Sequence, residues 1–254
     1  MTTSQNTQEQ LGQLLATTYA RHAVTAVPAA LEPDSGADAY AAQRAFLAAQ
    51  GLSIGGWKIG AKSEDGPIQG APLPSKSIHA APARIRLDEF PVLGLEVEIM
   101  FRLKHDLAAD AATLSEQDVL DSIAGIAASV EIVSSRLQGW PDVPKLNQLA
   151  DLQNHGALVV GEFVDYDRDL DFRTPQAVLN VNGRDVFNGA GANPAGDPRR
   201  LLHWLVKHCA EQGLALPAGT VITAGSYTGM FFAKERGEVS ASIAGLPPIR
   251  FEIV

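Results

Sequence analysis

The apolar positions of the chain change their spacing several times, which predicts a mixture of helices and strands. Leu11, Leu14, Leu15 and Tyr19 recur at helical spacing, as on one face of an amphipathic helix. Residues 37–50 predict a second helix, which Gly51 ends. Residues 55–61 and 93–103 instead alternate between apolar and other residues, so we expect a strand in each segment.

The middle of the chain predicts a helix and a long ordered loop. Ser115, with Asp118 three residues later, resembles a helix N-cap with its capping partner. The apolar face of that helix is expected to comprise Val119, Ile123, Ile126 and Val130. Residues 131–133 then predict a short strand. Residues 64–84 contain four prolines, which favours a loop or a set of turns.

The C-terminal half is rich in predicted strands. We expect strands at residues 157–164, 176–181, 221–224, 238–243 and 249–253, with a hairpin turn at Asn182-Gly183. One helix is expected from Asp197 to about Gly213. Because regular alternation of strands and helices is missing, a doubly wound parallel sheet is not expected. The pattern favours a single α+β domain with a curved or rolled sheet over residues 52–254, and a helical segment (residues 1–50) packed on it.

Charge and composition exclude several classes of protein. The 254 residues include 20 Lys and Arg against 29 Asp and Glu, a net charge of −9. Such an acidic chain is not expected to bind nucleic acid or an anionic membrane surface. The start of the chain lacks the features of a signal peptide, so we expect a cytoplasmic protein. The single Cys209 excludes an internal disulfide and a cysteine-based zinc site.

Four charged residues stand out within apolar surroundings. Glu96 and Glu98 are two residues apart on a predicted strand, so their carboxylates share one face. Two adjacent buried carboxylates resist joint ionisation, and a hard cation such as Mg²⁺, Mn²⁺ or Ca²⁺ removes that cost. Glu131 follows an apolar helix, and Lys58 lies between glycines in a position where a confined lysine could lose its proton readily. A solvated strand face and a surface lysine are the alternatives that these residues alone leave open.

Other candidate groups are weaker. Residues 223–229 end a strand in small and hydroxyl residues, whose N–H and O–H groups could hold a carboxylate. His79 and His155 are expected in loops and stay possible site residues. The chain contains no G-x-S-x-G, P-loop or G-x-G-x-x-G motif, which argues against serine hydrolases, nucleotide hydrolases and dinucleotide-binding enzymes.

Five segments taken together resemble one enzyme family. They are residues 56–63 (GWKIGAKS), 95–99 (LEVEI), 130–136 (VEIVSSR), 150–151 (AD) before Gly156, and 225–229 (GSYTG). In this order and spacing, the chain resembles the 2-keto-4-pentenoate hydratase and 4-oxalocrotonate decarboxylase family of the fumarylacetoacetate hydrolase superfamily.

The resemblance implies a mixed β-roll fold and a specific chemistry. It implies a Mg²⁺ or Mn²⁺ ion held by Glu96, Glu98 and Glu131, and a 2-oxo or 2-hydroxydienoic acid as substrate. It also implies that Lys58 lies near the C2 oxygen of the substrate and moves a proton there. Ser63, Ser226 and Thr228 match positions on the carboxylate side of the substrate. The resemblance further implies a homo-oligomer, and association with an enzyme of the same pathway.

The chain departs from the family pattern at the far end of the substrate. Residues 66–73 lack the acidic residue found in many hydratases of this family. The D-N-A-S-x-G motif appears as residues 151–156, in which Asp151 is kept, Leu152 replaces the asparagine and His155 is introduced. We therefore expect Asp151 to contact substrate and His155 to take part in catalysis.

Four functions are compatible with these residues. The first is hydration of a 2-hydroxydienoate in the degradation of aromatic rings. The second is decarboxylation of an oxo-dicarboxylate, and the third is cleavage of a C–C bond in an acylpyruvate by a histidine-activated water. The fourth is a non-enzymatic partner subunit, against which the presence of Lys58, Glu96, Glu98 and Glu131 argues.

Overall fold

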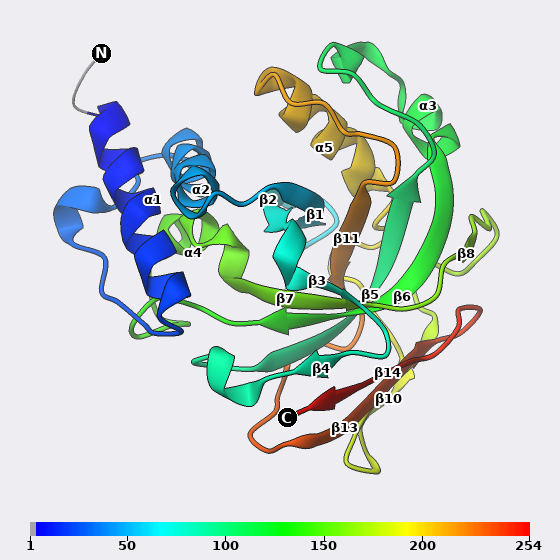
Figure 1. Ribbon diagram of the computed structural model, residues 1–254. Helices are drawn as coiled ribbons and strands as arrows, with labels where there is room; N and C mark the ends of the chain where they lie inside the picture. The colour runs from blue at the N-terminus through cyan, green and yellow to red at the C-terminus, as the bar shows by residue number, and fades with distance from the viewer. Residues whose placement is uncertain (1–3) are drawn as a thin grey trace.

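The computed structural model describes residues 4–254 and consists of two mixed β-sheets with helices packed beside them (Figure 1). Residues 1–3, part of the segment predicted to lack a signal peptide, lie outside the described residues. The helices are α1 (Ser4–Ala20), α2 (Gly36–Gln50), α3 (Glu116–Asp121), α4 (Lys145–Ala150) and α5 (Arg200–Glu211). The strands of the larger sheet are β1 (Ile54–Gly60), β2 (Gln69–Pro74), β3 (Ile78–Ala80), β5 (Gly94–Leu103), β6 (Ile123–Val133), β7 (His155–Val160), β8 (Val164–Asp165), β11 (Val221–Ser226) and β12 (Phe231–Phe232). Those of the smaller sheet are β4 (Arg84–Ile85), β9 (Gln176–Val181), β10 (Arg184–Ala190), β13 (Gly237–Ile243) and β14 (Ile249–Ile253).

The two sheets enclose one apolar core. The larger sheet has the order β2-β1-β11-β5-β6-β7-β3, with β12 beside β5 and β8 beside β6. The smaller sheet has the order β10-β9-β13-β14-β4. Fully buried side chains from both sheets, such as Phe101 of β5 and Leu179 of β9, belong to the same core cluster. The larger sheet curls in Figure 1, and the predicted α+β class with a rolled sheet is confirmed.

The N-terminal helices pack against a second apolar cluster. Leu15 of α1 and Phe46 of α2 are fully buried together with Leu149 of α4 and Ala71 of β2. Figure 1 shows α1, α2 and α4 grouped beside β2. These helices therefore pack beside the edge of the larger sheet that β2 forms. No helix among residues 4–254 is long and apolar enough to cross a membrane.

The predicted helix from residue 115 to residue 130 is wrong beyond its first turns. Ser115 and Asp118 form the expected capping box, but α3 ends at Asp121 and β6 begins at Ile123. Strand β6 lies between β5 and β7, and nearly all of its residues are buried. A strand buried on both faces is apolar at almost every position, so its spacing also matches a helix.

Residues 64–84 were expected to form a loop, yet they contain strands β2 and β3 and the start of β4. Pro72 and Pro74 lie in β2, which is an edge strand of the larger sheet. A proline has no N–H to donate, and an edge strand can leave one side of its backbone unpaired. The prolines therefore mark the edge of the sheet.

The bounds of two further elements differ by a few residues from those predicted. The segment 157–164 is divided between β7 and β8. Helix α5 begins at Arg200 instead of Asp197, and in the turn before it the Asp197 carboxylate accepts hydrogen bonds from the main chain and guanidinium of Arg199.

Candidate metal centre

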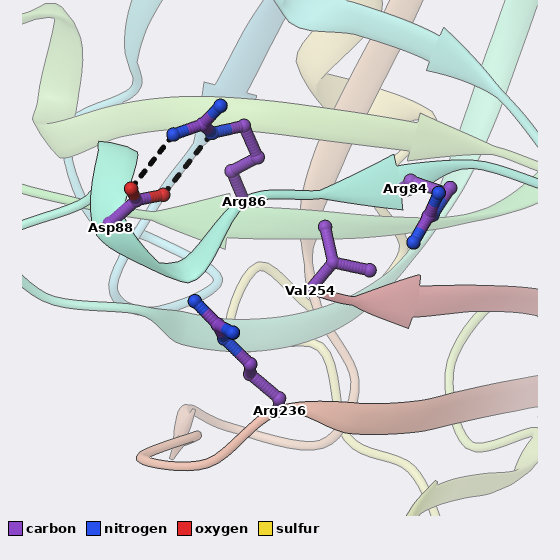
Figure 2. A pocket seen from close by; sticks show the side chains of 5 residues that line it. All are labelled: Arg84, Arg86, Asp88, Arg236 and Val254. Carbon is purple, nitrogen blue, oxygen red and sulfur yellow. Dashed lines mark hydrogen bonds and ion pairs between the residues drawn. The ribbon is translucent and has the colours of Figure 1, made fainter.

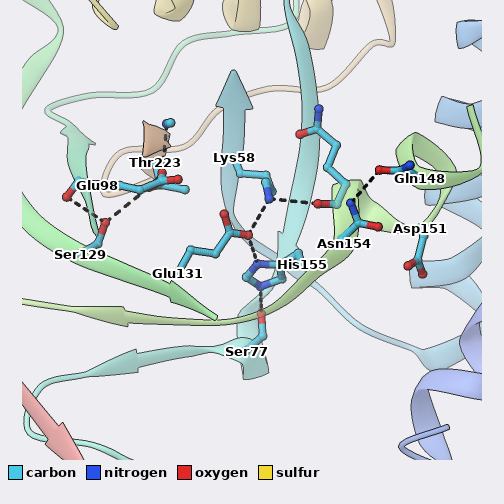
Figure 3. Close-up of polar contacts among 12 residues, drawn as sticks. Lys58, Ser77, Glu98, Ser129, Glu131, Gln148, Asp151, Asn154, His155 and Thr223 are labelled. Atoms are coloured by element: carbon cyan, nitrogen blue, oxygen red, sulfur yellow. Dashed lines mark hydrogen bonds and ion pairs between the residues drawn. The ribbon is translucent and has the colours of Figure 1, made fainter. Parts of the chain in front are cut away.

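Five neighbouring strands of the larger sheet each place one polar side chain at a common point (Figure 3). These side chains are Lys58 of β1, Thr223 of β11, Glu98 of β5, Glu131 of β6 and His155 of β7. Strand register places Lys58 opposite Thr223, and Glu96 opposite Glu131. The pairing of the strands therefore assembles residues that are far apart in the sequence.

The three glutamates form a compact cluster. One carboxylate oxygen of each of Glu96, Glu98 and Glu131 lies within 4.8 Å of the others. Glu98 is only 2% exposed and Glu131 is fully buried, so the alternative of a solvated strand face does not apply. The Oε2 atom of Glu131 is buried and has no hydrogen-bond partner among residues 4–254. A buried carboxylate oxygen that accepts no hydrogen bond is energetically costly. One oxygen from each of the three glutamates would make a set of three oxygen ligands, which suits a hard divalent cation. The residues therefore fit a Mg²⁺ or Mn²⁺ ion.

Residues 223–229, whose hydroxyl and N–H groups were expected to be able to hold a carboxylate, do bind one, and it is the side-chain carboxylate of Glu98. Thr223 Oγ1 donates a hydrogen bond to Glu98 Oε2, and the Gly225 N–H donates to the same oxygen at 3.0 Å. An irregularity in the pairing of β11 with β5 lies between Thr223 and Ser226, and Gly225 has a φ of +93° there. Glycine adopts this conformation without a steric cost, which directs its N–H toward Glu98.

Burial and mutual repulsion hold two of the carboxyls neutral at moderate pH. Burial raises the pKa of Glu98 to about 8, and the nearby charges of Glu131 and Glu96 contribute to that shift. Burial likewise raises the pKa of Glu96 to about 7, with a further contribution from Glu131. For Glu131, burial opposes ionisation, but Lys58 and His155 outweigh it and lower its pKa. A cation in the cluster would ionise all three groups.

Lys58 is held as an ammonium ion between two acceptors. Its Nζ atom lies 2.6 Å from Glu131 Oε1 and donates to the Gln153 carbonyl oxygen at 3.1 Å. Burial alone would lower the pKa of Lys58, but the surrounding glutamates raise it. The expectation that this lysine loses its proton readily is therefore wrong for the protein without a metal. An ammonium has three N–H donors, so one is left for a ligand in the cavity.

His155 begins β7 instead of lying in a loop, and it is 1% exposed. Its Nδ1 lies 3.0 Å from Glu131 Oε1, and its Nε2 lies 2.8 Å from Ser77 Oγ. Because burial lowers its pKa, the imidazole is neutral. An ionised Glu131 can only accept, so Nδ1 carries the proton, and the one hydroxyl hydrogen of Ser77 lies between His155 Nε2 and the Pro74 carbonyl oxygen, each 2.8 Å from Oγ. His155 thus orients Glu131 from behind, and no sequence signal singles out Ser77.

A turn of unusual conformation borders the cluster. Leu152, Gln153 and Asn154 all have positive φ, at +49°, +52° and +61°. Non-glycine residues rarely adopt this left-handed region, and such strain concentrates at functional sites. The turn presents the Gln153 carbonyl to Lys58 and the Asn154 carbonyl to the main chain at Ser134. Only Asn154, a residue that tolerates positive φ, gives a sequence signal for it.

A cavity of about 500 Å³ opens beside the glutamate cluster. Lys58, Ser63, Ser226 and the three glutamates line it, as do Gln69, Gln148, Gln153 and Asn154. Lys62 and Lys145, which sequence reasoning did not single out, line it as well. Thr228, Asp151 and His155 do not line this cavity. Thr228 Oγ1 instead accepts a hydrogen bond from the Val97 N–H.

Asp151 is fully buried in an ion pair with Arg136. Its carboxylate also accepts hydrogen bonds from the Arg136 N–H at 2.9 Å and from Ser135 Oγ at 3.1 Å. Figure 3 shows its side chain apart from Lys58 and Glu131. These contacts give Asp151 a structural role, in contrast to the expected contact with substrate.

Other cavities lack this chemistry. Arg84, Arg86, Asp88, Arg236 and Val254 line an open cavity at the smaller sheet, where Arg86 pairs with Asp88 at 2.8 Å (Figure 2). His79 lines a separate cavity of about 110 Å³ together with His22. The metal-site cavity contains no histidine, so the water-activating histidine expected of an acylpyruvate hydrolase is missing from its described lining.

A rolled α+β sheet that carries three clustered glutamates, two of them buried, beside a lysine is the architecture of a metal-binding enzyme. The chain belongs to the family described as "Fumarylacetoacetate (FAA) hydrolase C-terminal", whose model matches residues 72–254. This match covers the strands that supply Glu96, Glu98, Glu131 and His155.

Named relatives agree with this assignment. The chain is 30% identical over 156 residues to a 2-keto-4-pentenoate hydratase of Burkholderia vietnamiensis, a match covering 61% of the chain and 58% of that enzyme. It is 28% identical over 208 residues to a 2-oxo-hept-4-ene-1,7-dioate hydratase of Escherichia coli, covering 75% and 76% of the two chains. The fold is similar to that of a 4-oxalocrotonate decarboxylase from Pseudomonas putida G7, complexed with magnesium and adipate. The TM-score is 0.84 at 22% identity, and 97% of each chain is covered. The resemblance inferred from the sequence is confirmed.

Proposed function

We propose that the protein is a Mg²⁺- or Mn²⁺-dependent hydratase that adds water to a 2-hydroxy-2,4-dienoate and yields a 4-hydroxy-2-oxo acid. One observation carries the proposal: carboxylate oxygens of Glu96, Glu98 and Glu131 lie within 4.8 Å of one another beside the Lys58 ammonium, and the buried Oε2 of Glu131 has no hydrogen-bond partner in the described chain. The hydratases among the relatives support the same reaction class.

The residues present suit the steps of this reaction. Glu96, Glu98 and Glu131 would hold the metal, which supplies Lewis-acid stabilisation of an enolate. Lys58 would donate its free N–H as a hydrogen bond to the C2 oxygen of the substrate, and this bond would stabilise the negative charge on that oxygen when the enol loses its hydroxyl proton and a proton is added at carbon to give the ketone. Ser63 and Ser226 line the cavity and can bind the C1 carboxylate. His155 would act by orienting Glu131, since it does not reach the cavity.

Decarboxylation of an oxo-dicarboxylate is the second candidate. Apart from the three glutamates, the described lining of the cavity offers no carboxylate or histidine that could activate water. Decarboxylation needs the same stabilised enolate but no activated water, so this lining favours it. The expected homo-oligomer, the partner enzyme and the cytoplasmic location stay predictions.

Product analysis by NMR separates the candidates. The protein is incubated with Mg²⁺ and, in turn, with 2-hydroxypenta-2,4-dienoate, 4-oxalocrotonate and an acylpyruvate. A hydratase gives a 4-hydroxy-2-oxo acid with every carbon retained, whereas a decarboxylase releases CO₂. If no substrate is converted and calorimetry detects no Mg²⁺ or Mn²⁺ binding, the proposal is refuted.

A further inference from the structure

Of the three lysines that line the metal-site cavity, only Lys58 has a partner within the described part of the chain. Glu96, Glu98 and Glu131 are matched in number by three lysines, Lys58, Lys62 and Lys145, and every other lining residue is neutral. Lys58 is committed to Glu131 and Gln153. Lys62 and Lys145 are exposed at the cavity, and neither has an ion-pair or hydrogen-bond partner within the described part of the chain. Two cations therefore point to a further anionic group of a ligand.

The two free lysines come from two segments that border the cavity. Lys62 follows Lys58 by four residues, so their Cα atoms are at most about 13 Å apart at the rise of an extended chain. It lies two residues beyond the end of β1, in the same segment as Ser63 and Gly66, which also line the cavity. Lys145 is the first residue of α4, in the segment that also contributes Gln148 to the lining. Because the glutamates and both lysines line one cavity, a ligand held at the glutamates would share that cavity with two unpaired ammonium groups.

We propose that the substrate is a diacid, with a second carboxylate at the end opposite its 2-oxo acid group, and that Lys62 and Lys145 bind this carboxylate. The inference rests on the proposed function, because the metal must hold the first carboxylate. Three carboxylates and three ammonium groups cancel, so a divalent cation leaves two positive charges in the cavity. A monoacid neutralises one of them, and a diacid neutralises both. The named relatives include hydratases of both kinds of acid, so the lining residues decide between them.

A matched pair of ligands tests the second carboxylate directly. 2-Oxohexanoate and 2-oxoadipate share the 2-oxo acid group and the chain length, and they differ only in the distal carboxylate. We expect calorimetry with saturating Mg²⁺ to show that 2-oxoadipate binds at least about tenfold more tightly, as one additional charge-assisted hydrogen bond would provide. In the double variant Lys62→Ala/Lys145→Ala, the ratio of the two affinities is expected to fall close to one.

Lys207→Ala serves as the control, because Lys207 is an exposed lysine of α5 that does not line the cavity. This variant is expected to keep the wild-type affinity ratio. Mn²⁺ titration of each variant confirms that the metal site is intact. Equal affinity for the two ligands in the wild type would overturn the inference, and so would a preference for 2-oxoadipate that survives the double substitution. If the wild type binds neither Mn²⁺ nor either ligand, the proposed function itself fails.

Discussion

Replacing Asp151 by Asn should destabilise the protein strongly. Asp151 is 0% exposed, and its carboxylate is the only described carboxylate that pairs with Arg136, which is itself 4% exposed. The substitution removes the negative charge and leaves the Arg136 guanidinium buried without a counter-ion. Breaking one side of a buried ion pair costs about 3–5 kcal/mol. For a chain of this size, that loss lowers the melting temperature by about 6–20 °C.

Thermal and urea denaturation without metal provide the assay, and the chain offers a matched control. Asp88 pairs with Arg86 at 2.8 Å, but both side chains are more than half exposed. Asp88→Asn makes the same chemical change at the surface, where solvent screens the ion pair and little stability is expected to depend on it. We therefore expect a large difference in the free energy of unfolding between the two variants.

One result would refute this reasoning. Suppose that Asp151→Asn and Asp88→Asn have the same free energy of unfolding, but that Asp151→Asn shows a raised KM below its melting temperature. The Asp151 carboxylate then contacts substrate, as the sequence motif predicted. A loss of activity that accompanies destabilisation supports the structural role, because Arg136 also donates to the His155 carbonyl behind the metal site.

Three further predictions concern the metal centre. Glu98→Gln should abolish Mn²⁺ binding in calorimetry without lowering the metal-free melting temperature, because the pKa of about 8 shows that the neutral carboxyl is the favoured form there; retained Mn²⁺ affinity would contradict the ligand assignment. The folded-state pKa values of Glu96 and Glu98, about 7 and about 8, lie above that of an unfolded Glu, so stability should be lost as pH rises through them. Between pH 7 and 8, where unfolded histidines are mostly neutral, metal-free urea denaturation should show a loss of about 1–1.5 kcal/mol, and a flat profile would argue against these shifts. His155→Gln should weaken Mn²⁺ binding by about 10–100-fold, as loss of a residue that orients a metal ligand does; unchanged affinity with lost turnover would instead place His155 against the substrate.

The elements that could be predicted were those whose sequence separates two kinds of residue. Helices α1 and α2 have one apolar face, and strand β5 alternates apolar residues with charged and other residues although both of its faces are buried. Strand β6 was mistaken for a helix because both of its faces are buried, which removes the alternation. Strand β2 was missed because its prolines are tolerated only at the edge of a sheet, and sequence alone does not reveal which strand lies at the edge.

At the candidate site, too, the sequence predicted some features and only the structure revealed others. The spacing of Glu96 and Glu98 and the apolar surroundings of Glu131 and Lys58 marked these residues before any fold was known. Their protonation depends on distance and burial, so the raised pKa of Lys58 could not be inferred from its glycine-rich context. Asp151 matched a motif, yet only its burial against Arg136 distinguishes a structural carboxylate from one that contacts a ligand.

The sequence by itself therefore determined the family, the α+β class and the identity of the four charged residues at the centre, because residue types at defined spacings are a local property. Only the tertiary structure decided what surrounds them. Strand pairing placed His155 and Ser77 behind Glu131, and the approach of α4 placed Lys145 on the cavity wall. Such contacts join segments far apart in the chain, and their energies depend on distances and desolvation that exist only after the sheet has closed.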